Sequence, residues 1–341
     1  SEDSKTLDEV VVVGFGTQKK VNLTGAVTSV DTKALASRPV SQVGQALQGV
    51  VPGLNLSTPD LGGQLGQTMN VNIRGTGTIG KGSSASPLIL IDGMEGNMNN
   101  LNPEDIENIS VLKDAASSSI YGSRAAFGVI LITTKKGKAG KMQVNYNNSF
   151  RYSGPTSLPN QLDSYRFANY FNDAAINQGG SVIFDEETID RIQKYMAGEI
   201  TTTTIANGTN WHFHEKANDN VNWWKKHFQW AWSNEHNISL NGGTEKLQYY
   251  VSGSYLNQDG NLRYGNDNYK RYNATAKVNT QINKYVDFNI NTKFVRFDLD
   301  NPVYLEEGGL LYHDIARMWP MMPFKDPNGY YMRNGKLNQL T

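Results

Sequence analysis

The chain has 341 residues, carries 32 basic and 32 acidic side chains, and contains no cysteine. A balanced charge gives no bulk attraction to nucleic acid or anionic lipid, and a chain without thiols has neither disulfides nor thiol chemistry. The start of the chain lacks the basic and apolar regions of a signal peptide, so we expect a processed or trimmed start. Mean hydropathy is −0.51, and no apolar run reaches the ~18 residues of a spanning helix, although barrel strands would leave only a weak hydropathy signal.

Residues 1–20 are polar except for the β-branched run Val10–Val13, which follows the acidic residues Asp8 and Glu9. Two interpretations fit this run. It is the first strand of a domain, or it is a tethered strand that adds to the sheet edge of a partner through main-chain hydrogen bonds.

Residues 21–140 mix short strands, glycine-rich loops and a short helix without a regular βαβ rhythm, which makes a doubly wound sheet a poor fit. Ser41 is expected to cap a helix that runs to Gln48. The sequence predicts strands at residues 54–56, 71–73 and 88–91.

Residues 106–137 predict a strand, a short helix from Asp114 to a stop at Gly122, and a second strand at 129–132. That second strand is apolar on both faces, which is typical of a strand covered on both sides. The loop at 75–80 matches G-x-G-x-x-G, but Pro87 and the residues before it forbid the helix that a dinucleotide site needs. We therefore interpret it as a loop without nucleotide.

The sequence pattern changes after residue 140, where long alternating segments and amphipathic helices replace the short strands. Alternating side chains at 142–152 predict a first barrel strand, and two amphipathic helices are expected at 163–178 and 185–198. Two hairpins should follow, pairing residues 236–240 with 247–255 and residues 271–282 with 286–294. Long alternating strands with a face of Asn, Ser, Lys, Gln and Thr are typical of a barrel around a wet lumen.

Five of the six tryptophans cluster before the first hairpin, at positions 211, 223, 224, 230 and 232. Tryptophans at strand ends form the interfacial girdle of a barrel, or pack structurally, whereas a loop tryptophan can stack on the apolar face of a sugar ring. Trp211, with its neighbours Asn210 and His212, is the better candidate for ligand binding. His212 and His214 would share one strand face, but no third metal ligand follows at a useful spacing, so no metal site is predicted.

Four motifs in a fixed order carry a family resemblance: LDEVVVVGFG at residues 7–16, VNIRG at 71–75, PLILIDG at 87–93, and VLKDAASSSIYGSRAAFGVILITTKKG ending at Gly137. Together they resemble the SusC/RagA branch of the TonB-dependent outer-membrane transporters of Bacteroidetes-type bacteria. The resemblance implies an α+β plug domain inside a transmembrane antiparallel β-barrel of about 22 strands. About five strands fit in this chain, so we expect only the first few strands of a longer transporter.

The resemblance also implies a domain division. Residues 1–20 would hold the TonB box and a flexible leader, residues 21–140 the plug, and residues 141–341 the first part of the barrel with a long extracellular insertion near 155–235. Whether an extension domain precedes the TonB box in the full protein is left open.

The function implied is active import of oligosaccharides across the outer membrane, with a SusD-like surface lipoprotein as lid. Asp8, Glu9 and Val10, Val11, Val12 and Val13 would bind the C-terminal domain of TonB, which the TonB–ExbB–ExbD assembly energises. The RagA-like alternative is an oligopeptide importer. A surface adhesin or carbohydrate-binding protein without transport would have no use for Val10–Val13 or for residues 106–137.

Three charged residues lie inside apolar or small plug motifs: Arg74, Asp92 and Arg124. Buried charges need partners, so we predict a network that joins the plug to the barrel wall. No paired carboxylates, nucleophile–base pair or nucleophile elbow appears, so we expect no enzyme, no cofactor and no nucleic-acid partner.

Overall fold

The computed structural model describes residues 10–13, 16–19, 27–30, 38, 40–58, 64–73, 86–113, 118–302 and 310–332. The predictions for Asp8, Glu9, Arg74, the loop 75–80 and the helix start at Asp114 lie outside these residues. The chain divides into two compact units. The first unit comprises Ser1–Arg151, Ser233–Gln258 and Tyr269–Asp298, and the second comprises Tyr152–Trp232, Asp259–Asn268 and Leu299–Thr341.

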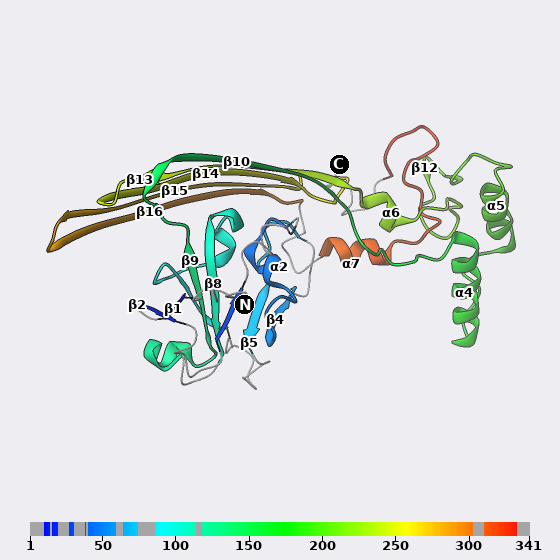
Figure 1. Ribbon diagram of the computed structural model, residues 1–341. Coiled ribbons are helices and arrows are strands. Elements are labelled where there is room, and N and C mark those ends of the chain that lie inside the picture. The colour runs from blue at the N-terminus through cyan, green and yellow to red at the C-terminus, as the bar shows by residue number, and fades with distance from the viewer. Residues whose placement is uncertain are drawn as a thin grey trace, which may run out of the picture. The chain divides into compact units, whose positions relative to one another are not determined.

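The first unit contains a small mixed sheet, two short ribbons and a sheet of long strands (Figure 1). Its short elements are β1 (Val10–Val13), β2 (Gly16–Lys19), β3 (Val27–Val30), α2 (Val43–Leu47), β4 (Leu54–Ser57), β5 (Asn70–Ile73), β6 (Leu88–Ile91), β7 (Met94–Glu95), η2 (Met98–Asn100), η3 (Pro103–Asp105), β8 (Ile106–Leu112), η4 (Ser119–Ala125) and β9 (Val129–Thr134). Its long strands are β10 (Gly140–Ser153), β13 (Ala231–Gly243), β14 (Leu247–Asp259), β15 (Asn268–Asn283) and β16 (Val286–Asp300).

The small sheet has the strand order β3-β8-β9-β6-β7, with β6 parallel to β9 and the other neighbours antiparallel. Its centre is β9, the strand that the sequence predicts to be covered on both faces, and the structure confirms this. Ile130 is fully buried and Ile132 nearly so, and on β8 Ile109 is also fully buried. Burying one such side chain contributes about 1.5–3 kcal/mol, so β8 and β9 form the stable centre of the plug.

The β6–β7 hairpin turns on two residues, Asp92 and Gly93, because Ile91 pairs with Met94. Both turn residues have positive φ, 50° for Asp92 and 89° for Gly93. A type I′ turn requires this, and Asp-Gly is among its preferred sequences. The turn therefore fixes Asp92 at the tip of the hairpin.

One local prediction in the plug needs correction. Ser41 does not cap α2, because Gln42 is the N-cap residue and makes no side-chain cap, while the Ser41 hydroxyl donates instead to Gln258 Oε1 on β14 at 3.1 Å. A tertiary contact therefore overrides the local capping pattern. Gly122, the predicted stop, does end a helical turn, because it has non-helical φ of 71° inside η4, and a further 3₁₀ turn follows it to Ala125.

The long sheet follows chain order, β10-β13-β14-β15-β16, and its strands lie side by side over the plug in Figure 1. These are the five strands that the sequence predicts, and both hairpins are confirmed, with His236 opposite Tyr255 in the first. The strands run to 13–16 residues. The alternation of polar and apolar side chains marks only the middle of each strand, so the sequence underestimates the length of the wall strands. We call this sheet the wall.

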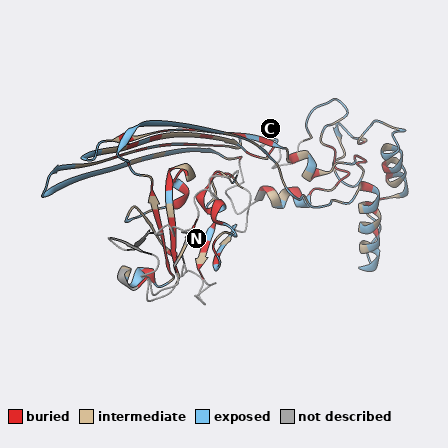
Figure 2. Ribbon diagram, in the orientation of Figure 1, coloured by how far each residue is buried: buried red, intermediate tan, exposed pale blue. Residues whose placement is uncertain are grey.

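The two faces of the wall differ in the side chains they carry, and Figure 2 colours the residues by burial. The face that packs on the plug buries polar side chains, among them Asn237, Ser239, Ser252, Asn273 and Thr275. The opposite face exposes apolar and aromatic side chains: Val144, Tyr146, Phe150, Ile238, Val251, Phe288 and Phe294. A sheet that is apolar outward and polar inward is typical of a barrel wall in a membrane. Across the described part of the chain, no helix has the length and apolarity needed to cross a membrane.

The segment between β9 and β10 joins the plug to the wall and is held at several points. The Lys135 amide donates to Asp105 O at 2.8 Å, and the Lys138 amide donates to Asn241 Oδ1 at 2.9 Å. Gly137 is buried between them, where a Cβ atom would overlap the backbone of Gln248 and Tyr249. Only glycine fits this close approach.

The second unit contains α4 (Ser164–Asn177), α5 (Glu186–Met196), β11 (Ala206–Asn207), β12 (Asn210–Trp211), α6 (Trp223–His227) and α7 (Leu310–Arg317). The two predicted helices are confirmed as α4 and α5. Asp163 and Asp185 cap them by accepting from the Arg166 and Thr188 amides. Gly179 and Gly198, at φ 78°, follow their ends.

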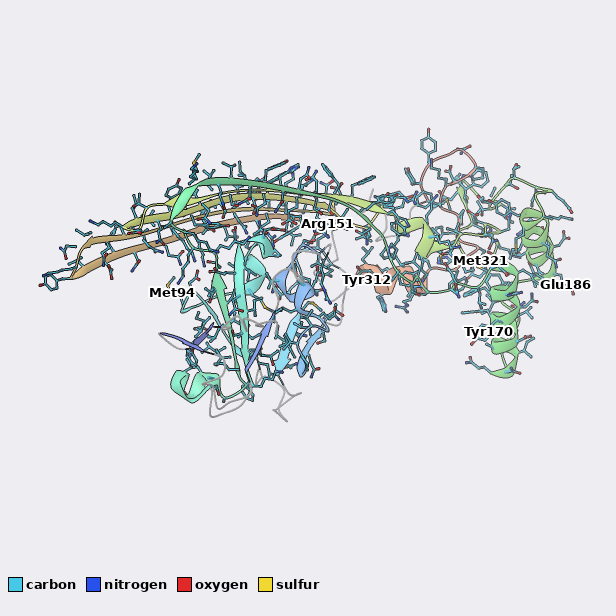
Figure 3. The ribbon with its side chains drawn as sticks, viewed as in Figure 1. Met94, Arg151, Tyr170, Glu186, Tyr312 and Met321 are labelled. Atoms are coloured by element: carbon cyan, nitrogen blue, oxygen red, sulfur yellow. The ribbon has the colours of Figure 1, made fainter. Side chains whose placement is uncertain are left out.

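Figure 3 labels two residues of the cores of this unit, Tyr312 and Met321. Tyr312 packs on a cluster around the buried Trp223, and Met321 is fully buried in a cluster with Phe184 and Ile192. Asp219 lies between α5 and the chain near Phe324. Burial raises the pKa of Asp219. The burial of Tyr195 itself, together with the nearby Asp219 carboxylate, raises the pKa of Tyr195 to about 12.

Asn172 of α4 holds the segment that precedes α5, because its buried side-chain amide donates to Phe184 O at 2.7 Å and accepts from the Ile183 and Phe184 amides at 2.9 Å. Replacing Asn172 with aspartate should cost about 1–3 kcal/mol or more, because the carboxylate cannot donate to the buried carbonyl. Thermolysin should then cut the full-length protein near residues 178–185 more than tenfold faster. Asn169→Ala, which loses one bond to the carbonyl of Tyr165 in its own helix, should change the rate less than twofold, and equal effects would contradict this role.

Candidate functional site

The plug meets the wall at Asp92, whose carboxylate contacts five donor groups through hydrogen bonds and ion pairs. Two come from the plug itself, the Thr134 amide at 2.9 Å and the Thr134 hydroxyl at 2.7 Å. The other three come from the wall: Lys277 Nζ at 3.0 Å, Lys293 Nζ at 2.5 Å and Asn291 Nδ2 at 3.1 Å. We call Lys277 and Lys293 the wall lysine pair.

This contact is buried and ionised. The side chains of Asp92 and Lys277 are 9% and 4% exposed. Burial alone would raise the pKa of Asp92, but the hydrogen bonds from Lys293 and Thr134 and the charge of Lys277 outweigh it and hold the pKa of Asp92 well below its ordinary range. The plug therefore presents a fixed negative charge to two cations of the wall.

Asp105 makes a second contact with the wall. The Tyr250 hydroxyl donates to one of its carboxylate oxygens at 2.8 Å and the Ser252 hydroxyl donates to the other at 2.9 Å. Asp105 is 4% exposed, and it lies at the end of η3, whose first residue is Pro103. The short helical turn thus presents a buried carboxylate to hydroxyls of β14.

A third contact joins η2 to a charged cluster of the wall. Glu235 lies between Arg151, at 2.8 Å, and Arg271, at 3.4 Å, and Arg271 also donates to Asn99 O at 3.2 Å. Figure 3 labels Arg151 on β10. Among the described residues, Arg271 Nε and Asn99 Oδ1 are buried without a hydrogen-bond partner. Unpaired buried polar atoms favour hydration, so this contact is polar rather than a dry apolar core.

The residues predicted for the plug network separate in the structure. Asp92 contacts the wall, whereas Arg124 of η4 pairs with Glu95 of β7 within the plug, with side chains 68% and 52% exposed. The wall lysine pair, Asp105 and Arg271 were not singled out from the sequence. The one signal for them was the polar face of the predicted strands, since Arg271 and Lys277 alternate with outward residues such as Tyr272.

Two further predictions concern Val10–Val13 in the first unit and the residues around Trp211 in the second. Val10–Val13 form β1, which pairs antiparallel with β2, Val12 lying opposite Thr17. In the second unit, Asn210 and Trp211 form β12, opposite Asn207 and Ala206. Asn210 is exposed, and Trp211 and His212 are half-buried. The strand ends at Trp211, so the expectation that His212 and His214 share one strand face is wrong.

The remaining tryptophans of the cluster have two environments. Trp223 is buried and donates through Nε1 to Trp319 O at 2.9 Å. Trp230 and Trp232 are exposed and flank Tyr152, with ring centroids 5.3 and 4.7 Å from it. An exposed aromatic group at strand ends is the arrangement of an interfacial girdle.

Comparisons with known proteins agree with this arrangement. A family model described as the TonB-dependent receptor plug domain matches residues 19–129. A TonB-dependent receptor of Formosa agariphila is 30% identical over 338 residues, which cover 96% of this chain and 28% of the relative. The receptor SusC of Bacteroides thetaiotaomicron is 32% identical over 308 residues, which cover 86% of this chain and 27% of the relative.

Among solved structures, the RagAB peptide importer in its open-open state matches with a TM-score of 0.74 at 29% identity, covering 96% of this chain and 37% of that chain. This chain spans less than a third of the length of these curated relatives. The plug match, the five wall strands and these relatives together give the fold, a plug inside a β-barrel of the outer membrane. The chain therefore belongs to the SusC/RagA type of TonB-dependent outer-membrane transporters, of which it carries the plug domain and part of the barrel wall.

Proposed function

We propose that the full protein imports oligosaccharides across the outer membrane, driven by TonB and assisted by a SusD-like surface lipoprotein that closes over the barrel. The observation that carries this proposal is the plug–wall contact. It consists of ion pairs and hydrogen bonds at Asp92, Asp105 and Arg271 rather than of a continuous apolar core. Water can replace polar contacts of this kind, so the plug can be moved and can return.

The proposal divides the chain by role. Residues 1–20 form the leader, with Asp8, Glu9 and Val10–Val13 as the strand that TonB engages. Residues 21–140 form the plug, a division supported by the family match to 19–129, and residues 141–341 form wall strands and the extracellular insertion near 155–235. A pull on the leader acts on the plug, and ligand in the lumen favours release of the leader.

The kind of cargo separates two candidates. The resemblance of the plug motifs to the SusC branch and the tryptophan-rich insertion favour oligosaccharide, while the structural similarity to a protein described as a peptide importer favours oligopeptide. Isothermal titration of the full transporter complex with panels of oligosaccharides and peptides tests both. Binding of peptides alone would overturn the oligosaccharide proposal.

A TonB pull-down tests energy coupling. A peptide covering residues 5–18 should retain the isolated periplasmic domain of TonB, and the same peptide with Val12→Pro should not. Failure of the unmodified peptide to bind would favour a surface adhesin over a transporter.

Trp211 offers a sharper test of oligosaccharide binding. Trp211→Ala should weaken binding of the best oligosaccharide about 2- to 10-fold, because stacking of an aromatic ring contributes about 0.5–1.5 kcal/mol. Trp230→Ala is the matched control, since Trp230 packs on Tyr152, and it should leave the dissociation constant unchanged. A loss at Trp230 and none at Trp211, measured by titration, would reverse the assignment.

A further inference from the structure

A cleft of about 780 Å³ lies within the first unit, between the β6–β7 hairpin and η4 of the plug and the inner faces of β15 and β16. Its volume is in the range of pockets that hold small ligands. Asp92 and Lys277 both line it, so it adjoins the contact that holds the plug to the wall.

The lining combines three kinds of group. Leu88, Leu90 and Leu131 form an apolar patch on the plug side, and Asn279, Asn289 and Asn291 line the wall side with amides. Three cations, Arg124, Lys136 and Lys277, and two carboxylates, Asp92 and Glu95, also line the cleft. Lys277 pairs with Asp92, and Arg124 pairs with Glu95. The cleft is thus suited to a polar, extended ligand and has an excess of positive charge.

The charges are divided unevenly between plug and wall. The wall supplies four cations to these ion pairs: Arg151, Arg271, Lys277 and Lys293. Among the described residues, the only carboxylate that the wall supplies to the same ion pairs is Glu235. Asp92, the carboxylate of the wall lysine pair, belongs to the plug. When the β6–β7 hairpin moves away, two ammonium groups lose their counter-charge at once. Removing one partner from a buried pair is strongly unfavourable.

An anion that enters the cleft would relieve this cost. Asp92 already shows the geometry of such an anion, because a single carboxylate oxygen lies within 2.5–3.1 Å of Lys293, Lys277 and Asn291. We propose that the cleft is a transit subsite for anionic cargo, in which a carboxylate or sulfate of the passing oligomer replaces Asp92 on the wall lysine pair. This inference rests on the proposed import function and adds the charge of the cargo to it.

Binding to the purified full-length transporter tests the subsite without any need for TonB. The probes are an oligogalacturonate, the neutral galactose oligomer of equal length, and a pair of pentapeptides that differ in glutamate and glutamine. Asp92→Asn removes the internal competitor and should tighten binding of the anionic probes about tenfold. Lys293→Gln in addition should abolish that gain, because it removes a cation that is 21% exposed while keeping a hydrogen-bond donor. Lys284→Gln, in the β15–β16 turn, is the matched control and should change nothing.

The outcomes are separable. If Asp92→Asn tightens neutral and anionic probes equally, or if Lys293→Gln leaves the gain intact, the subsite is overturned. A gain for the oligogalacturonate alone identifies an acidic glycan as the source of the anion, and a gain for the glutamate peptide alone identifies an acidic peptide. The import proposal fails on a different result, namely uptake by whole cells that does not depend on TonB.

Discussion

Replacing Asp92 with asparagine in the full-length transporter should weaken the hold of the wall on the plug by about 3–5 kcal/mol, because it leaves Lys277 buried without a counter-charge. Asparagine tolerates positive φ, so the β6–β7 turn is kept and the effect isolates the charge. This chain has no cysteine, so a single Ser110→Cys probe on the buried strand β8 reports opening of the plug. The urea midpoint of thiol labelling should fall clearly in Asp92→Asn.

Glu95→Gln is the matched control. It breaks the pair with Arg124 on the neighbouring strand, where both side chains are more than half exposed. An exposed pair contributes about 0–1 kcal/mol, so the labelling midpoint should barely move. Equal shifts for the two variants would show that Asp92 does not hold the plug.

The effect of Asp92 should also depend on pH in a defined direction. A carboxylate with a lowered pKa in the folded state contributes its stability above its ordinary value of 3.8 and loses it as pH falls through the folded value. The difference in midpoint between the wild type and Asp92→Asn should therefore stay constant from pH 8 to about pH 4. A difference that vanishes between pH 7 and pH 5 would show that another group titrates at this contact.

Val12→Pro should abolish TonB-dependent uptake while leaving cargo binding intact. Proline removes a main-chain donor from the four-residue strand β1, and strand addition depends on main-chain hydrogen bonds. Uptake of labelled cargo by whole cells should fall to the level of a strain without TonB. Titration of the purified transporter should give an unchanged dissociation constant.

Val12→Ile is the control for this prediction, because it keeps a β-branched side chain and the amide donor. It should retain most of the uptake. Wild-type uptake in Val12→Pro would show that TonB engages another part of the leader.

The sequence predicts those parts of the fold in which one pattern repeats locally. Alternation identifies the five wall strands, and one apolar face at helical spacing identifies α4 and α5, whose ends lie within two residues of the prediction. Ser41 was misassigned because a capping residue is defined by its near neighbours, whereas its hydroxyl bonds to Gln258, 217 positions away. Local chemistry does not encode such a contact.

The same limit applies to the candidate site. Asp92 stands out as a charge in an apolar motif, but its partner Lys293 is 201 positions away. Arg124 stands out for the same reason and bonds to Glu95, only 29 positions away. A charged residue inside an apolar motif indicates that it has a partner elsewhere in the fold. Only the folded sheet, in which β15 and β16 are neighbours, shows which charge it is.

The fit of Gly137 against Gln248 and Tyr249 restricts how the plug can travel. The Lys135 amide bonds to Asp105 of the plug and the Lys138 amide bonds to Asn241 of the wall. The covalent exit of the plug is therefore fixed at one end to each and cannot slide along the wall. In the proposed import cycle, the plug then moves by rotating about residues 135–138, or by unfolding that begins at the other end of the domain. The plug therefore cannot leave the barrel as one rigid body while residues 135–138 keep these contacts.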